Sequence, residues 1–246
     1  MLVSPILQAI PGIDHGFGNR DDDMAALFPT TWGQRALQHE RHGTHIAVID
    51  HAGQDCGEAD GMVTGQPDVL LTIATADCAP ILLARRDGAA VAALHAGWRG
   101  ALDGIVDAFA AMLAARGDSP ADWHAAIGPA AGACCYEVSA DVIESFRARY
   151  AVPQDLLAPQ PRRLNLAGIV RWQLERARFG AVWSSQSCTM CTTGEGDGAG
   201  FVYHSYRRDR ETRLPSVDVQ WSAIAIAADA RLERGTPSDR VGRAAV

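Results

Sequence analysis

Cys78 and His95 are the residues in this sequence whose types and spacing first suggest metal chemistry. Cys78 directly precedes, and His95 ends, a predicted hairpin in which Asp87-Gly88 joins two β-rich runs, Ala79–Arg86 and Ala89–His95. If these two residues form the whole loop, His95 lies opposite Pro80, and Cys78 is its diagonal neighbour on the same face. A thiolate and an imidazole whose backbones are about 7 Å apart can bind one metal ion. Core packing is the alternative role, because cysteine is among the residue types most often buried.

The string HAGWRG ends the second of these runs and begins a helix. Small residues and a glycine break the strand, and apolar residues then recur with helical spacing as far as Arg116-Gly117. This apolar set consists of Leu102, Ile105, Val106, Phe109, Met112 and Leu113. His95 therefore lies where a strand gives way to a helix, a place where binding sites are common.

The elements that must position these residues alternate irregularly between strands and helices. Predicted strands cover His45–Asp50, Val69–Ala74, Trp123–Ile127, Val182–Ser187, Val217–Ile226 and a segment within 201–209. Two further helices are predicted to begin at the N-cap residues Ser139 and Asn165 and to end near Tyr150 and Gly180. There is no strict βαβ repeat, and at least one hairpin is antiparallel. The pattern therefore indicates an α+β domain with mixed β-sheets.

Length and charge limit the class of protein. At 246 residues and 48% hydrophobic, the chain fits a single domain, which we place over residues 1–230, with 231–246 as a frayed tail. A formal net charge of −7 and a pI near 5.6 argue against nucleic acid or an anionic membrane as partner, so we expect a small-molecule substrate. No apolar run approaches the roughly 20 residues of a membrane span, and Met1–Ile10 lacks a signal-peptide pattern. These features predict a cytoplasmic protein.

Six cysteines in a chain of this length do not indicate a small secreted protein stabilised by disulfides. Reduced thiols or metal ligands are the expected forms. Cys188 and Cys191 make one Cys-x-x-Cys pair, and because there is no second such pair, the count excludes a zinc ribbon. The adjacent Cys134 and Cys135 are predicted to be buried thiols, since a disulfide between neighbours is strained.

Further polar candidates lie outside the hairpin. Four of the eight histidines fall between positions 39 and 51, and His42 precedes a glycine at a strand entrance, where the backbone can approach a ligand closely. Arg20, in HGFGNR, and the pair Arg207-Arg208 could hold an anion such as phosphate or a carboxylate. The arginines could instead be solvated charges, and His42 could be solvated or packed in the core.

Six strings taken together resemble one family, the YfiH or laccase-domain proteins, also named multicopper polyphenol oxidoreductases and purine nucleoside phosphorylases. The strings are HGFGNR, RHGTHIAVID, TADCAPILL, AALHAGWRG, AIGPAAGACCYEV and FVYHSYRRD. The resemblance implies a layered α/β/β/α sandwich with mixed sheets, and a metal, usually zinc, bound by two histidines and one cysteine. Matched position by position, these ligands are His42, Cys78 and His95. The hairpin argument pairs the last two independently, whereas His42 comes from the resemblance alone.

The activity that the resemblance implies is a zinc-dependent purine nucleoside phosphorylase. Its substrates would be adenosine, inosine or methylthioadenosine-type nucleosides, and adenosine deamination would be a further activity. Three protein ligands leave one zinc position open, as in catalytic sites. We expect Arg20 or the Arg207-Arg208 pair to orient phosphate, and Asp77 to relay protons or hold a ligand. Asp77 could equally stabilise a turn.

Three other functions remain open at this stage. A copper-dependent polyphenol oxidase fits the family's older name, since copper also accepts His and Cys ligands. A hydrolase that edits a peptidoglycan precursor would use Cys78 as nucleophile and a histidine as base. A non-catalytic binding module with a structural zinc would need a fourth ligand. The oligomeric state stays open between a monomer and a homodimer.

Overall fold

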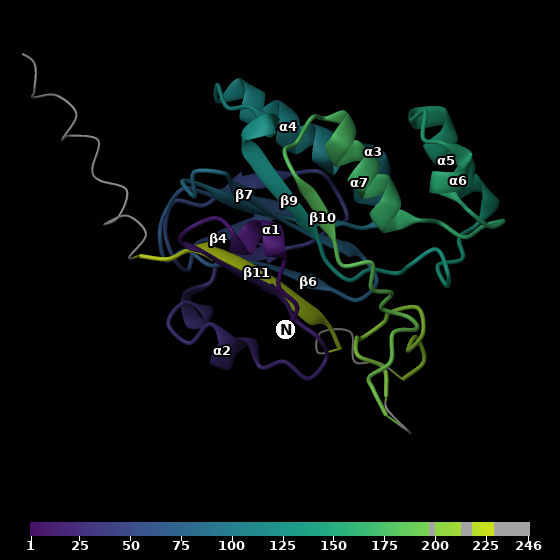
Figure 1. The fold of residues 1–246 in the computed structure, drawn as a ribbon, viewed down its shortest axis with the longest axis horizontal. Helices are drawn as coiled ribbons and strands as arrows, with labels where there is room; N and C mark the ends of the chain where they lie inside the picture. The colour runs from purple at the N-terminus through teal and green to yellow at the C-terminus, as the bar shows by residue number, and fades with distance from the viewer. Residues whose placement is uncertain (197–199, 213–217, 229–246) are drawn as a thin grey trace, which may run out of the picture.

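Two β-sheets that pack against each other form the centre of the fold (Figure 1). The computed structural model describes residues 1–196, 200–212 and 218–228. Its strands are β1 (Ile13–Phe17), β2 (Leu37–His39), β3 (Ile46–Val48), β4 (Asp55–Glu58), β5 (Gly61–Thr64), β6 (Leu71–Thr75), β7 (Ala79–Arg85), β8 (Val91–Ala96), β9 (Trp123–Ile127), β10 (Val182–Ser184) and β11 (Gln220–Ile226). Its α-helices are α1 (Pro5–Gln8), α2 (Met24–Leu27), α3 (Trp98–Asp103), α4 (Ile105–Ala115), α5 (Ala140–Arg149), α6 (Gln154–Leu157) and α7 (Leu166–Arg176).

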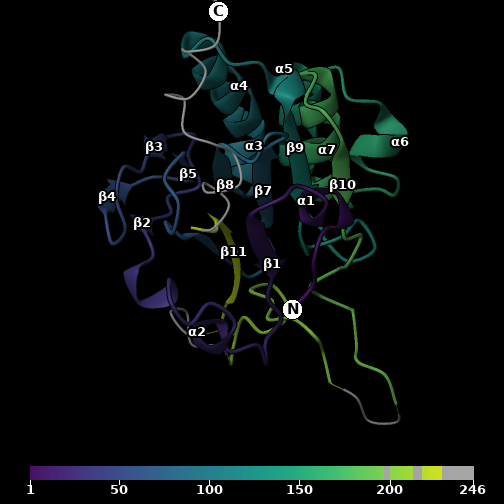
Figure 2. The ribbon, with the colours of Figure 1, turned by 60° about the vertical axis from the view of Figure 1, so that its left-hand side comes forward.

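The larger sheet has the strand order β10-β9-β7-β8-β5-β3, and the smaller has the order β1-β11-β6. β7 is antiparallel to both β8 and β9, whereas β9 is parallel to β10 and β3 is parallel to β5. β2 and β4 form a separate parallel pair. In Figure 2 the strands β2 to β5 lie at one side of the molecule and the helices α5 to α7 at the other. The larger sheet is therefore mixed and the smaller one is antiparallel, which confirms the predicted α+β class.

Alternate residues of the central strand β7 enter two different hydrophobic cores. Ile81 and Leu83 pack on the side of the long helices, while Leu82 and Ala84 pack between the two sheets. The far face of the smaller sheet is covered by α2, through Met24. The order from α3, α4 and α7 through the two sheets to α2 is the expected α/β/β/α arrangement (Figure 1).

The hairpin of β7 and β8 has the predicted register, in which Pro80 pairs with His95. In the connecting loop Gly88 has a φ of 70°, a left-handed conformation that glycine adopts readily, and its N–H donates to the carbonyl oxygen of Arg85 at 2.8 Å. This register brings Cys78, just before β7, to the same end of the hairpin as His95.

The helix predicted directly after His95 is divided in two. α3 ends at Asp103 and α4 begins at Ile105, because the intervening Gly104 has a φ of 95°. A left-handed residue cannot continue a right-handed helix, so the chain changes direction there. The apolar periodicity did not reveal this break, since the buried residues on both sides of it face the same core.

The two predicted helix starts differ in how they are capped. Asn165 precedes α7, and its side-chain oxygen accepts a hydrogen bond from the N–H of Gly168 at 3.1 Å, which confirms the predicted cap. Ser139 precedes α5 as predicted, but its hydroxyl makes no capping bond to that helix. The strand β10 ends at Ser184 rather than at the predicted Ser187.

The strand predicted within 201–209 is wrong. Phe201 makes only an isolated bridge to Thr193, and the following residues form turns. Their backbone groups bond to side chains; for example, the N–H of Arg207 donates to Asp77 at 2.7 Å. A strand needs such groups for its neighbour in a sheet, and here side chains from distant parts of the chain bind them instead.

Two predictions concern residues outside those that the structure describes. These are Val217, predicted to open the last strand, and the tail 231–246. The described part of the last strand, β11, begins at Gln220. Within the described ranges, none of the helices has the length and apolar character needed to cross a membrane.

Buried His15 in β1 predicts that stability depends on pH. Its Nε2 accepts a hydrogen bond from the backbone N–H of Ser4 at 3.0 Å, and burial lowers its pKa to about 4. An unfolded chain protonates this side chain near pH 6.5, so between about pH 6.5 and pH 4 the unfolded state binds more protons than the folded state. Stability is therefore lost as the pH falls through this window. We expect a loss of about 2 kcal/mol between about pH 7.5 and pH 5.

Urea unfolding at these two pH values measures the loss. The variant His15→Gln does not titrate in this range, so its stability should fall by about 2 kcal/mol less than that of the wild type. An equal pH dependence in both proteins would show that His15 is not the responsible group.

Candidate metal centre

The three predicted ligands meet at one end of the β7–β8 hairpin. Donor atoms of His42, Cys78 and His95 all lie within 4.8 Å of one another. The two imidazole rings are 4.8 Å apart between centroids and are inclined by 73°. This spacing fits a single ion, whose bonds to sulfur and nitrogen are about 2.0–2.3 Å long.

Three separate segments supply these side chains. His95 lies within β8, Cys78 directly precedes β7, and His42 lies between β2 and β3 with a left-handed φ of 62°. His95 is buried, Cys78 is partly buried and His42 is exposed. The centre is therefore anchored in the sheet and open to solvent on the side of His42.

A buried carboxylate, that of Asp60, holds two of the three ligand segments in place. Its Oδ1 lies 2.8 Å from Nδ1 of His95 and accepts the backbone N–H of His42 at 2.7 Å. Its Oδ2 accepts the backbone N–H of Gly43, also at 2.7 Å. A carboxylate on one ring nitrogen orients a metal-binding histidine and leaves the other nitrogen for the ion. In His95 the available nitrogen is Nε2.

Charges within the group favour the metal-binding form of the cysteine. Burial alone would raise the pKa of the Cys78 thiol, but the charge of His95 and hydrogen bonds from both histidines lower it to about 7. Burial disfavours protonated His95, yet the negative charges of Cys78 and Glu40 hold its pKa well above the usual value. Burial would raise the pKa of the Asp60 carboxyl, but its hydrogen bonds, chiefly the one with His95, lower this pKa below its usual value. The thiolate is the form of cysteine that binds metals.

The donor set and the surrounding backbone fit a metal ion. One thiolate and two imidazoles suit zinc or copper. Gly97 passes so close that a Cβ atom there would lie 2.7 Å from Cδ2 of His42 and 3.1 Å from Sγ of Cys78. Among the described residues this group has three ligand atoms, so a bound ion would keep a position for a substrate atom or water.

We expect the substitution Gly97→Ala to weaken zinc binding by about 10–100-fold, the range typical when the surroundings of a metal site are disturbed. The added methyl group would displace His42 or Cys78. Competition with a chromophoric chelator measures the affinity. Gly33→Ala is the matched control, because a Cβ at Gly33 meets no atom within 4 Å. Equal affinities in the two variants would contradict the prediction.

Asp77, the predicted proton relay, connects several loops. Its Oδ1 accepts a hydrogen bond from the hydroxyl of Thr189 at 2.6 Å, and its Oδ2 accepts the backbone N–H of Arg207 at 2.7 Å. Its own carbonyl oxygen accepts the N–H of Ala131 at 2.9 Å. The carboxylate is buried and both of its oxygens are engaged, directly beside Cys78 in the chain.

Arg207 is linked to the candidate metal centre through Asp77, which directly precedes Cys78 in the chain, and its side chain lies beside Tyr136. Its guanidinium carbon is 5.4 Å from the centre of the Tyr136 ring, and one N–H donates to the carbonyl oxygen of Glu137 at 2.7 Å. Burial and, next, the charge of Cys78 raise the pKa of Tyr136 to about 12, while Arg207 opposes the shift. The charges of Cys78 and Arg207 thus act on the Tyr136 phenol in opposite directions.

Arg208 and Arg20 have different surroundings. The guanidinium of Arg208 donates to both carboxylate oxygens of Asp209 at 2.6 and 2.7 Å and to the carbonyl oxygen of Tyr203 at 2.7 Å. It also lies 3.9 Å from the centre of the Phe201 ring. Arg20 is exposed, with one N–H 3.5 Å from the carbonyl oxygen of Phe201. Arg208 is therefore largely engaged by the protein, and Arg20 is accessible.

A cavity of about 470 Å³ adjoins the metal centre through Glu40. The Oε2 atom of Glu40 is 3.8 Å from Nδ1 of His95, and its Oε1 accepts the backbone N–H of Ala74 at 3.0 Å. Trp221 and Arg35 line the same cavity, with the Arg35 guanidinium carbon 5.5 Å from the centre of the Trp221 ring. An aromatic side chain with nearby polar groups suits a flat heterocyclic ligand.

Sequence reasoning missed three residues of this site, Asp60, Glu40 and Tyr136. Asp60 directly precedes β5, and Tyr136 follows the glycine-containing loop after β9, so polar residues at strand ends were the available signal. Glu40 carried no such signal. Its position beside His95 depends on how the segment after β2 packs against β6, where the N–H of Ala74 donates to Glu40.

The prediction that Cys134 and Cys135 are buried thiols is wrong. Cys134 is exposed and Cys135 is partly buried. Their sulfur atoms group with those of Cys188 and Cys191. The cause is the parallel pairing of β9 and β10, since the loops that follow two parallel neighbours leave the sheet at the same edge.

The fold and the site together define an α+β domain, with a mixed and an antiparallel sheet between helical layers and, at the end of a hairpin, a group of three side chains whose donor atoms suit a metal ion. The chain belongs to the family described as multi-copper polyphenol oxidoreductase laccase, whose family model matches residues 19–217. This range contains all three predicted ligands, and the match confirms the family resemblance found in the sequence.

Relatives of known name agree with this assignment. A protein of Deinococcus radiodurans named purine nucleoside phosphorylase is 39% identical over 174 residues, which cover 71% of this chain and 64% of the relative. A protein of Haemophilus influenzae with the same name is 32% identical over 184 residues, covering 72% of this chain and 71% of the relative. The chain thus spans slightly less than two thirds of the Deinococcus protein.

Solved structures confirm the layered fold. The crystal structure of YlmD from Geobacillus stearothermophilus has a TM-score of 0.74 at 25% identity and covers 91% of this chain and 94% of its own. The crystal structure of the hypothetical protein YfiH from Bacillus licheniformis has a TM-score of 0.74 at 23% identity, covering 87% of this chain and 92% of its own. The layered arrangement of helices and sheets described above is therefore shared with both.

Proposed function

We propose that this chain is a zinc-dependent purine nucleoside phosphorylase that acts on adenosine, inosine or methylthioadenosine-type nucleosides. The observation that carries the proposal is the group of His42, Cys78 and His95 with an adjoining cavity that contains an aromatic side chain. The shared name of the relatives supports the reaction class. Zinc bound by three protein ligands would supply a Lewis acid with one open position.

The cavity beside Glu40 is the proposed binding site for the purine. In phosphorolysis a phosphate oxygen bonds to the anomeric carbon of the sugar while the bond from that carbon to the purine nitrogen breaks. The base leaves with a proton. Trp221, which lines the cavity beside Arg35, is the proposed contact of the base, and Glu40, which lines the same cavity, is the group proposed to donate this proton to the leaving purine.

Phosphate binding is assigned to Arg207, with Arg20 as a second candidate. Arg207 lies beside Tyr136, on which the charge of Cys78 also acts, and the exposed Arg20 is accessible to an anion. The contacts of Arg208 support a structural role instead. Since both oxygens of Asp77 accept hydrogen bonds, we assign Asp77 to positioning Arg207 through its backbone N–H rather than to proton relay.

Phosphate-dependent release of hypoxanthine from inosine tests this proposal. We expect the base and ribose 1-phosphate to form together, and both to be lost after chelation and restored by zinc. Release of ammonia from adenosine tests the additional deaminase activity. Failure to release the base from any purine nucleoside, with zinc and phosphate present, would overturn the proposal.

A thiol-dependent hydrolase is a second candidate, and one observation favours it. Without a metal, burial would raise the pKa of the Cys78 thiol. The charge of His95 and hydrogen bonds from both histidines outweigh this effect and lower the pKa to about 7. Such a thiol is a competent nucleophile near neutral pH. The substrate in this case would be a misincorporated amino acid in a peptidoglycan precursor. Cleavage that survives chelation and is lost in Cys78→Ser would identify this function.

The description of the family favours a copper-dependent polyphenol oxidase as a third candidate. Chemistry at several coppers requires several sets of ligands, and among the residues that the structure describes only one group of metal ligands contains histidine. Oxygen consumption by copper-loaded protein with a phenol would support the oxidase.

A non-catalytic module with a structural zinc agrees less well with the group of His42, Cys78 and His95. Structural zinc sites usually have four protein ligands, and this group has three.

A further inference from the structure

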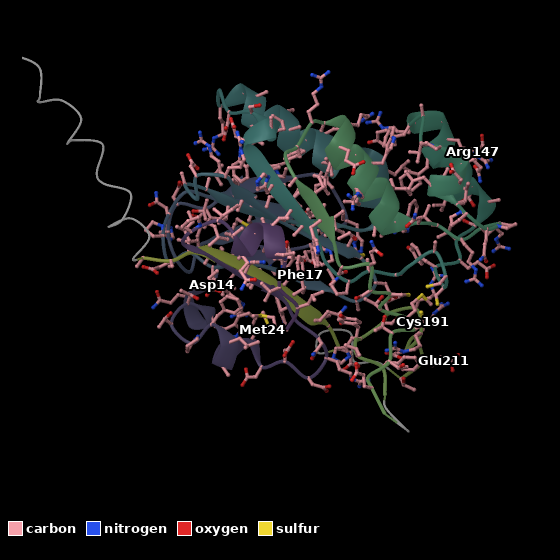
Figure 3. All side chains as sticks on the ribbon, viewed as in Figure 1. Asp14, Phe17, Met24, Arg147, Cys191 and Glu211 are labelled. Carbon is pink, nitrogen blue, oxygen red and sulfur yellow. The ribbon has the colours of Figure 1, made fainter. Side chains whose placement is uncertain are left out.

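Four cysteines form a cluster that is separate from the three-ligand centre. Cys134 and Cys135 come from the loop after β9, and Cys188 and Cys191 come from the loop after β10. Their sulfur atoms all lie within 4.8 Å of one another, and those of Cys134 and Cys191 are 3.5 Å apart. Figure 3 shows Cys191 on the loops that lie beyond the lower end of β10.

The backbone is arranged to bring these sulfurs together. Beyond the parallel strands β9 and β10, Ala130 and Cys188 form a parallel bridge, so the two loops run side by side. The N–H of Gly132 points at Sγ of Cys188 at 3.3 Å, a hydrogen bond that supports a thiolate ligand. A Cβ at Gly132 would lie 3.2 Å from Sγ of Cys134 and 3.4 Å from Sγ of Cys188. The absence of a side chain at this position leaves room for the cluster.

The spacing of the sulfurs suits one tetrahedral ion. Zinc–sulfur bonds of about 2.3 Å place the four sulfurs of a tetrahedral site about 3.8 Å from one another. A [4Fe–4S] cluster needs wider spacing, because each of its four thiolates binds a different iron. All six cysteines of the chain are free thiols in the structure, so the four are available as ligands.

We propose that Cys134, Cys135, Cys188 and Cys191 bind one zinc ion in a closed structural site. Four thiolates fill the coordination sphere of zinc, which leaves no position for a substrate. The ion fastens the loop after β9 to the loop after β10. Thr189, which follows Cys188, donates its hydroxyl to Asp77 beside the three-ligand centre. The structural zinc therefore stabilises the loops that surround that centre, whatever reaction takes place there.

Metal analysis of the protein purified without chelators tests the proposal. We expect about two zinc ions per chain in the wild type, about one in Cys191→Ser and about one in Cys78→Ser. Cys56→Ser is the matched control and should keep about two, since Cys56 is a free cysteine outside both groups. A Cys191→Ser protein with the same zinc content as the wild type, or iron instead of zinc at this site, would overturn the proposal.

Alkylation of the wild-type protein gives a test that does not depend on a variant folding. Cys134 and Cys191 are exposed, so iodoacetamide should modify them readily when they hold no metal. We expect both to resist alkylation in the zinc-loaded protein and to react after chelation, as located by mass spectrometry. Rapid alkylation of the zinc-loaded protein, or a disulfide between these two residues under native conditions, would exclude a zinc ion bound by the cluster.

Discussion

Replacing Cys78 with serine is expected to lower kcat/KM for phosphate-dependent cleavage of inosine by at least about 10²–10³-fold, with loss of the zinc bound at that centre. Cys78 supplies the only thiolate of the three-ligand group. A neutral hydroxyl binds zinc much less strongly than a thiolate does, and the remaining two imidazoles would not hold the ion. Steady-state kinetics combined with metal analysis measures both effects.

The control for this experiment is Cys56→Ser. Cys56 is also partly buried, and its thiol donates to the carbonyl oxygen of Leu37 at 3.2 Å. It belongs to neither metal group, so activity should stay within about twofold of the wild type. His95→Ala should behave like Cys78→Ser, whereas His45→Ala, at an exposed position, should behave like the control. Wild-type phosphorolysis in Cys78→Ser and His95→Ala would separate the metal group from the reaction.

Replacing Asp60 with alanine is expected to destabilise the folded protein by about 3–5 kcal/mol, the usual cost of removing one member of a buried charged pair. The change would leave Nδ1 of His95 and the backbone N–H groups of His42 and Gly43 without their acceptor. It would also release the turn that carries His42 from the strand that carries His95. Urea unfolding of the metal-free proteins measures the loss of stability.

The milder variant Asp60→Asn separates positioning of the ligands from general stability. We expect a folded protein that binds zinc about 10–100-fold more weakly. The carboxylate raises the pKa of His95, so its removal should move the titration of the His95 imidazole to lower pH, as followed by NMR in the metal-free protein. Asp50→Asn, at an exposed position, is the control. Unchanged zinc affinity and an unchanged His95 titration would mean that Asp60 acts on stability alone.

The part of the site that could be predicted from the sequence is the part held by local pairing. The hairpin predicted from Asp87-Gly88 has the right register for β7 and β8, and this placed Cys78 and His95 together. The observed connection between the strands, residues 86–90, is longer than the predicted two residues but keeps that register. His42 could be assigned only through the family resemblance, because its position depends on Asp60, a residue eighteen positions further along the chain. Contacts of that kind leave no periodic signal in the sequence.

The remaining errors have the same physical origin. The segment 201–209 was predicted to contain a strand, but the N–H of Arg207 bonds to Asp77, 130 positions earlier in the chain. The cysteines of the two loops were counted as one Cys-x-x-Cys motif and one adjacent pair, while their grouping arises from the parallel pairing of β9 with β10. In both cases a distant partner decided the structure, and local propensity did not.

The position of β11 in the smaller sheet has a consequence for biosynthesis. This strand lies between β1 and β6, although it is the last of the three to be translated. Until Ile226 has emerged from the ribosome, β1 and β6 have no partner to pair with, and the apolar residues between the two sheets stay uncovered. A nascent chain stalled before Gln220 should therefore be prone to aggregation and to binding by chaperones, even though both cysteine-containing loops and all three ligands of the metal centre have already been synthesised.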